Sequence, residues 1–174
     1  RFTPGEGRDT AAPHILVARN LERIYDNASA IRAFALVRAQ HPAARLTITG
    51  SGPERAALER QAQELGVAEA VTFTGRVENA EMPALYRTAS IVLNPSLADN
   101  TPVSILEALA SGVPVVSTNV GGVPFLVEHE TTALLVPPGD HAAMARACLR
   151  LLAEQGLTQM LVRSGHELSS EFAW

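Results

Sequence analysis

The sequence predicts an α/β protein built on a parallel sheet that carries helices on both of its faces. Short apolar runs alternate with amphipathic segments along almost the whole length of the 174 residues. The runs are continuously apolar and do not alternate with polar residues, which is typical of strands buried on both faces. Strands that alternate with helical segments in this way form βαβ units, and such units produce a parallel sheet.

Six apolar runs predict six strands, which in chain order span residues 14–18, 45–49, 71–74, 91–93, 113–117 and 133–136. Helices are expected between and after them, at about residues 27–40, 53–66, 79–88, 103–111, 140–155 and 157–170. In the first helix, Ile31, Phe34 and Val37 fall on one side, as an amphipathic helix requires. No internal repeat or linker interrupts this pattern. Residues 1–174 are therefore predicted to form a single Rossmann-like, doubly wound domain of about six strands.

Polar residues and glycines mark the ends of these helices. Ser51 and Glu54 have the spacing of a capping box, and Pro53 suits the first turn of the helix that follows. Gly66 suits the position just after the last turn of that helix. Further caps are predicted at Asn79, Gly112 and Asp140. Each of them stands where the helical periodicity begins or stops, which supports the predicted boundaries.

Charge and composition exclude several classes of protein. The net charge of −4 argues against a nucleic-acid-binding surface, which needs a basic stripe. No stretch approaches the roughly 20 apolar residues of a membrane span. The polar segment 1–12 has no signal-peptide core and does not begin with methionine, which predicts a fragment of a longer protein. The single cysteine, Cys148, is expected to be a core residue, and a reducing compartment is permitted.

Glycine, asparagine and arginine gather where the predicted strands end. Arg19 follows the first strand, residues 50–53 the second, residues 75–77 the third, residues 94–104 the fourth and residues 118–122 the fifth. The carboxyl ends of parallel strands meet at one edge of the sheet, and ligands bind there, near the point where the strand order reverses. Backbone N–H groups beside an arginine are suited to an anion.

Taken singly, most of these residues have a structural interpretation as well. Gly50 and Gly52 together form a common tight turn, and they do not begin a dinucleotide fingerprint because Arg55 occupies its sixth position. A dehydrogenase-type domain is therefore disfavoured. Arg19 alone could be a surface residue, and Asp99 alone a loop carboxylate. Glu107 lies in the first two turns of an otherwise apolar helix, where a buried charge needs a partner.

One long block carries a family resemblance. Residues 99–108, Asp-Asn-Thr-Pro-Val-Ser-Ile-Leu-Glu-Ala, precede Ser-Gly-Val-Pro at 111–114 and Gly-Gly-Val-Pro at 121–124. This pattern resembles the family 4 (group 1) retaining glycosyltransferases of GT-B fold, over nearly the whole chain. The resemblance implies a C-terminal domain that holds a nucleoside diphosphate sugar, while an N-terminal acceptor domain, absent from this chain, closes over it.

The resemblance also assigns roles to individual residues. The family has two acidic residues eight positions apart, usually both glutamate, and here they are Asp99 and Glu107. Glu107 would accept hydrogen bonds from the ribose hydroxyls, Asp99 would contact the sugar hydroxyls, and Arg19 would bind the diphosphate. Further contacts to the nucleotide are expected from Gly50, Gly52, Val77, Thr101, Pro102, Val103 and Ser104. The family usually places a lysine about five residues after the arginine. This chain contains no lysine, and Arg23 is the candidate replacement.

The reaction implied is transfer of a hexose from a UDP-, GDP- or ADP-sugar to an acceptor hydroxyl, with retention of configuration. No metal or other cofactor is expected, because the sequence lacks Asp-x-Asp and its histidines are scattered. The isolated domain would be inactive, since acceptor-side groups belong to the absent domain. A cytoplasmic bacterial protein of polysaccharide biosynthesis is implied, with any membrane contact made through the absent domain. The alternative is a degenerate nucleotide-binding module without catalytic activity.

Overall fold

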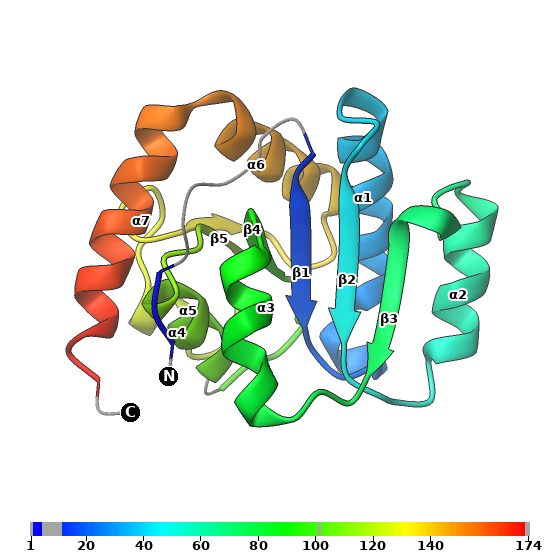
Figure 1. Ribbon diagram of the computed structural model, residues 1–174, viewed down its shortest axis with the longest axis horizontal. Coiled ribbons are helices and arrows are strands. Elements are labelled where there is room, and N and C mark those ends of the chain that lie inside the picture. The colour runs from blue at the N-terminus through cyan, green and yellow to red at the C-terminus, as the bar shows by residue number, and fades with distance from the viewer. Residues whose placement is uncertain (1, 5–11, 101, 173–174) are drawn as a thin grey trace.

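Six parallel strands form one sheet, in the order β3-β2-β1-β4-β5-β6 (Figure 1). The structure is a computed structural model that describes residues 2–4, 12–100 and 102–172. The strands are β1 (His14–Ala18), β2 (Arg45–Thr49), β3 (Val71–Gly75), β4 (Ile91–Asn94), β5 (Val115–Thr118) and β6 (Leu134–Val136). The order runs outward from β1 through β2 and β3, then restarts beside β1 with β4. This reversal between β1 and β4 is the switch point of a doubly wound sheet, so the predicted fold class is confirmed.

Helices cover both faces of the sheet (Figure 1). They are α1 (Asn27–Gln40), α2 (Arg55–Glu64), α3 (Met82–Thr88), α4 (Val103–Ala110), α5 (Val123–Leu126), α6 (His141–Ala153) and α7 (Gln155–Ser169). Short 3-10 turns, which the sequence did not predict, lie at η1 (Arg23–Tyr25), η2 (Ala68–Ala70) and η3 (Asn79–Glu81). Helix α5 was also missed, because four residues with a proline in the first turn give no periodic signal.

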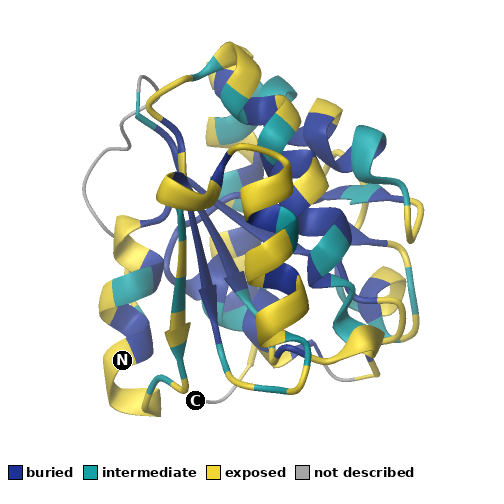
Figure 2. Ribbon diagram, turned by 90° about the vertical axis from the view of Figure 1, so that its right-hand side faces the viewer, coloured by how far each residue is buried: buried dark blue, intermediate teal, exposed yellow. Residues whose placement is uncertain are grey.

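Each face of the sheet has its own hydrophobic core, and the central strand β1 contributes to both. Ile15 and Val17 pack with Phe34 of α1 in one cluster, whereas Leu16 packs with Tyr86 of α3 and residues of α4 in the other. These side chains are at most 1% exposed. Figure 2 shows the central strands buried between two helical layers, whereas the edge strand β3 is partly exposed. Alternate side chains of a strand point to opposite faces, so an uninterrupted apolar run is what this position requires.

The predicted capping box at Ser51 and Glu54 is wrong. Helix α2 begins only at Arg55, and Glu54 makes no side-chain capping bond. The backbone of Leu21 uses this segment instead: its N–H donates to the Ser51 carbonyl at 3.0 Å, and its carbonyl accepts from the Glu54 N–H at 3.0 Å. These tertiary bonds tie the loop after β2 to the loop after β1, in place of a local cap.

The other predicted caps had mixed outcomes. Asp140 caps α6, since its Oδ1 accepts from the Ala143 N–H at 2.9 Å. Gly66 follows α2 with a φ of +72°, as a glycine after a helix commonly does. Asn79 is not the cap of α3: it begins the 3-10 turn η3, and α3 starts three residues later without a side-chain cap.

Two further observations bear on the predicted protein class. No helix within the described ranges is both long and apolar enough to span a membrane. Cys148 lies on α6 and is completely buried in the core. Burial raises the pKa of its thiol to about 12, because the thiolate would lose its hydration there. Cys148 is therefore a core residue, as the sequence predicts.

Candidate functional site

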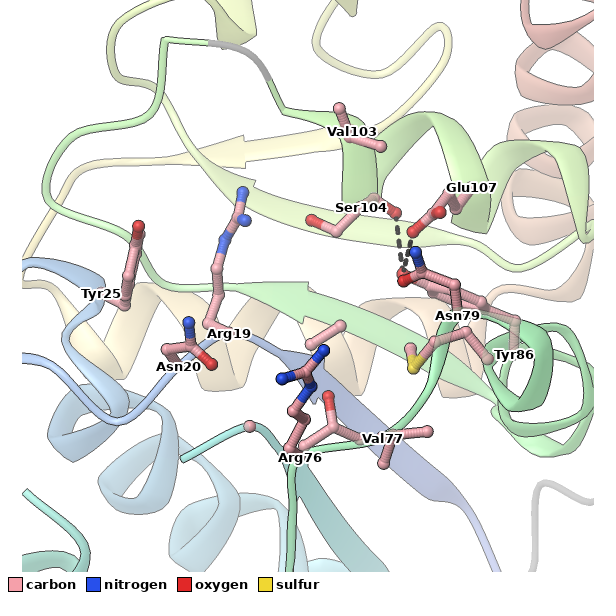
Figure 3. A pocket seen from close by; sticks show the side chains of 14 residues that line it. Arg19, Asn20, Tyr25, Arg76, Val77, Asn79, Tyr86, Val103, Ser104 and Glu107 are labelled. Carbon is pink, nitrogen blue, oxygen red and sulfur yellow. Dashed lines mark hydrogen bonds between the residues drawn. The ribbon is translucent and has the colours of Figure 1, made fainter. Parts of the chain in front are cut away.

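A cavity of about 310 Å³ opens at the carboxyl end of the sheet, beside the switch point between β1 and β4 (Figure 3). Its walls come from the ends of β1 and β2, the turn after β3, helix α3 and the first turns of α4. Six residues predicted for the site line it: Arg19, Gly50, Val77, Val103, Ser104 and Glu107. Segments far apart in the sequence thus meet at the edge of the sheet where a ligand site was expected.

The remaining predicted residues lie around this cavity or outside the residues that the structure describes. Asp99 lines a neighbouring hollow of about 320 Å³, which shares Arg19 and Tyr25 with the cavity. Pro102 is buried at the N-cap of α4. Gly52 does not line the cavity; it lies against Leu21, where a Cβ would be 2.4 Å from the Leu21 carbonyl oxygen. Thr101 falls outside the described residues.

Arg19 stands between the two hollows, and its side chain is only 15% exposed. Its Nη2 donates to the Asp99 carboxylate in an ion pair, and its Nε donates to Asn94 Oδ1 at 3.2 Å. The guanidinium carbon also lies 5.4 Å from the centre of the Tyr25 ring. Partners on three elements therefore fix the guanidinium, so little side-chain entropy remains to be lost when it binds an anion.

Asn94, the last residue of β4, organises the groups behind Arg19. Its Nδ2 donates to Asp99 Oδ2 at 3.1 Å and to Ser117 Oγ at 3.2 Å, while Ser96 Oγ donates to Asn94 Oδ1 at 2.7 Å. Asn94 and the two serines are at most 2% exposed. Asn94 was not among the predicted site residues, although a polar residue that ends an apolar strand is a recognisable signal at this edge.

A pair of glycines lets the loop that carries Asp99 lie against the segment after β5. The Gly122 N–H donates to the Asp99 carbonyl at 2.8 Å. A Cβ on Gly121 would lie 2.4 Å from the same oxygen, and one on Gly122 would lie 2.3 Å from the Asn100 carbonyl oxygen. No side chain fits at such distances, so glycine is required there for steric reasons.

Glu107 faces the cavity from the second turn of α4. The buried hydroxyl of Tyr86 on α3 donates to Glu107 Oε1 at 3.1 Å and lies 3.4 Å from the Ser104 carbonyl (Figure 3). Burial raises the pKa of Glu107, whereas the Tyr86 hydrogen bond and the charge of Arg19 lower it. A carboxylate has room for about four hydrogen bonds, so the one from Tyr86 leaves acceptor capacity for a ligand.

The start of α4 supplies a different kind of group. Pro102 is its N-cap and provides no side-chain cap. The first N–H groups of a helix have no partner within the helix, and they carry part of its positive dipole. Val103 is 47% exposed, and it lines the cavity together with Ser104. The first turn of α4 therefore presents backbone donors beside Arg19 and Glu107, an arrangement suited to an anion.

A second cation in the cavity is not the one proposed from the sequence. Arg23 does not line the cavity: its side chain is 92% exposed, and its Nε lies 3.9 Å from Glu54 Oε1. Arg76, just after β3, does line it. Among the described residues, no group of three or more His, Cys, Asp or Glu is placed to hold a metal ion.

The sequence of this chain matches a known protein family. The family model for group 1 glycosyl transferases matches residues 12–154. The chain is 34% identical to the D-inositol 3-phosphate glycosyltransferase of Salinispora tropica, over 100% of this chain and 41% of that protein. It is 35% identical to the 2-deoxystreptamine glucosyltransferase of Streptomyces kanamyceticus, over 72% of this chain and 33% of that protein. The chain therefore spans well under half the length of these relatives.

Solved structures give the same picture of the fold. Sucrose-phosphate synthase of Thermosynechococcus elongatus superimposes with a TM-score of 0.87 at 30% identity, over 98% of this chain and 45% of that one. The C-terminal domain of LpcC, a group 1 glycosyl transferase of Francisella tularensis, gives a TM-score of 0.86 at 21% identity and covers 98% of this chain and 94% of that one. With its family model matched over most of its length, the chain belongs to the group 1 glycosyltransferases and has the fold of a GT-B C-terminal domain.

Proposed function

We propose that this chain is the donor-binding domain of a glycosyltransferase and holds a nucleoside diphosphate sugar in the 310 Å³ cavity. One observation carries the proposal: Arg19, the first turn of α4 and the Glu107 carboxylate converge on a single cavity at the switch point of the sheet. A cation and free backbone donors suit a diphosphate, and a carboxylate suits vicinal hydroxyls. A nucleoside diphosphate sugar combines both kinds of group.

Each wall of the cavity has a proposed contact. Glu107 accepts hydrogen bonds from the ribose hydroxyls, and the backbone at Val77 and Gly50 faces the nucleoside. Arg19 and the N–H groups of Val103 and Ser104 bind the diphosphate. Asp99 lines the neighbouring hollow, which is the place we propose for the sugar.

The proposed reaction is transfer of a hexose to an acceptor hydroxyl, with retention of configuration. The bond from the anomeric carbon to the diphosphate breaks, a bond to the acceptor oxygen forms, and the acceptor proton is released. Negative charge develops on the leaving diphosphate, where Arg19 and the start of α4 stabilise it. No metal or cofactor is invoked, and we propose that the acceptor is held by a part of the protein outside this chain.

Calorimetric titration of the chain with UDP, GDP, ADP and NAD tests the proposal. We expect one nucleoside diphosphate to bind selectively, and Arg19→Ala to weaken its binding much more than that of the free nucleoside. Preferential binding of NAD, or no diphosphate binding by either the chain or the full-length protein, would contradict it. A full-length protein that binds the sugar nucleotide but transfers nothing would be a binding module without catalysis.

A further inference from the structure

Two arginines from different strands line the cavity. Arg19 follows β1, and Arg76 follows β3. Gly75 has a φ of +72° and its carbonyl accepts from the Gly50 N–H at 2.8 Å, which turns the chain at the end of β3. From this turn the Arg76 side chain extends into the cavity, on the side away from α4 (Figure 3). Among the described lining residues, Arg19 and Arg76 are the only permanent cations.

The charge of Arg19 is already compensated within the protein. It forms an ion pair with the Asp99 carboxylate, whose side chain is only 7% exposed. Glu107 adds a second carboxylate to the same surroundings. Arg19, Asp99 and Glu107 together therefore carry no net positive charge, although a diphosphate brings at least two negative charges. A further cation is needed if the cavity is to attract such an anion.

Arg76 is the arginine whose charge is available. Its side chain is 81% exposed, and its Nε lies 3.9 Å from Glu78 Oε1, a distance at which an exposed pair interacts weakly. Arg55 is engaged elsewhere. It donates to the Phe73 carbonyl at 3.3 Å, and its Nε lies 3.5 Å from Glu59 Oε1. Arg23 lies outside the cavity.

We propose that Arg76 is the second phosphate-binding cation of this site and grips the nucleotide from the side opposite α4. The proposal rests on the proposed function, since it assigns a residue to the same nucleoside diphosphate. A guanidinium presents paired N–H donors that match two phosphate oxygens. In the free protein the exposed side chain of Arg76 has only the long contact with Glu78, so its guanidinium remains available to a phosphate.

The test compares Arg76→Ala with Arg76→Lys, and uses Arg23→Ala as the matched control outside the cavity. Each variant is titrated with UDP, GDP and ADP and with uridine, guanosine and adenosine, and circular dichroism verifies its fold. For the diphosphate that the unaltered chain binds, we expect Arg76→Ala to weaken affinity by roughly tenfold to a hundredfold, as for a lost charge-assisted hydrogen bond. The matching nucleoside should bind as before, and Arg23→Ala should change nothing. Arg76→Lys should recover only part of the lost affinity, because lysine keeps the charge but not the paired donors.

The opposing outcomes separate this proposal from the proposed function. If Arg19→Ala loses the diphosphate while Arg76→Ala binds it normally, the Arg76 role is wrong and the donor site stands. Equal losses for diphosphate and nucleoside in Arg76→Ala would show that Arg76 contacts the base, which also overturns the proposal. If the unaltered chain and the full-length protein bind none of the three diphosphates, both proposals fail together.

Discussion

The hydroxyl of Tyr86 donates a hydrogen bond to Glu107 Oε1 at 3.1 Å, and this contact joins α3 to the helix that begins at the cavity. Tyr86 is completely buried, so its hydroxyl has little freedom to turn elsewhere. Burial raises the pKa of Tyr86 well above its ordinary value, and the adjacent Glu107 charge raises it further. Tyr86 therefore remains a neutral donor at neutral pH, and its hydroxyl contacts one oxygen of Glu107.

Removing that hydroxyl should change how Glu107 titrates. In Tyr86→Phe the hydrogen bond that lowers the pKa of Glu107 is lost, so its pKa rises further. If the carboxylate binds the ribose, the fall in nucleotide affinity on acidification should begin at a higher pH than in the unaltered chain. Titration of the diphosphate at a series of pH values from acidic to neutral, in Tyr86→Phe and in the unaltered chain, measures this shift. Unchanged pH profiles would limit Tyr86 to a packing role.

Glu107→Gln should stabilise the fold while weakening nucleotide binding. Burial raises the pKa of Glu107 above its unfolded value, so the folded protein binds the proton more tightly. The stabilisation that comes from protonated Glu107 is therefore fully present below the pKa of this group in the unfolded chain. It is lost as the pH rises through the higher pKa of Glu107 in the folded protein. Glutamine removes the buried charge, and the melting temperature should rise at pH 7 but not at pH 4. Glu64→Gln, at an exposed position on α2, is the control and should show no such pH dependence.

Arg19 and Asp99 should be coupled in stability, whereas removing the Asp99 charge should not restore the diphosphate binding that Arg19→Ala loses. Arg19→Ala leaves the buried Asp99 carboxylate without its ion pair, which costs about 3 kcal/mol in typical buried pairs. Adding Asp99→Asn removes that charge and should recover most of the lost stability. Diphosphate binding should stay weak in the double variant, because the Arg19 side chain that binds the phosphate is still missing. Urea unfolding and calorimetry on the two single variants and the double variant test this; additive stability losses would contradict the coupling.

Gly122→Ala should displace the loop that holds Asp99. Its Cβ would meet the Asn100 carbonyl oxygen at 2.3 Å, and such overpacking typically costs about 1–3 kcal/mol. We expect a lower melting temperature together with weaker diphosphate binding, because Arg19 depends on Asp99 for its position. Gly156→Ala is the matched control: its Cβ would have nothing within 4 Å and it lies in α7. A stable Gly122→Ala with normal binding would show that the loop moves freely.

The sequence predicted the sheet well because burial on both faces leaves a local mark. Strands such as β1 and β4 are uninterrupted apolar runs, and the residues that follow them lie at one edge of any parallel sheet. The position of the cavity could therefore be predicted, and the family resemblance pointed to six of the residues that line it. Their roles in binding remain predictions.

Contacts between residues far apart in the sequence could not be predicted in this way. Arg19 and Asn94 are 75 residues apart in the sequence, and Tyr86 and Glu107 are 21 apart. No local pattern shows that such side chains will meet. The capping box at Ser51 failed for a related reason, since the Leu21 carbonyl accepts the Glu54 N–H that Ser51 was expected to cap. Arg23 was chosen by its spacing from Arg19, whereas the turn after β3 brought Arg76 into the cavity.

The reversal of strand order between β1 and β4 separates the arginines of the site from its carboxylates. Arg19 and Arg76 belong to the half of the chain that ends with α3, whereas Asp99 and Glu107 belong to the half that begins with β4. A cut in the short connection between Thr88 and Ile91 would leave all the cations of the site on one fragment and both carboxylates on the other. Neither piece alone could hold a nucleotide, so nucleotide binding would serve as a direct readout of the two halves reassembling.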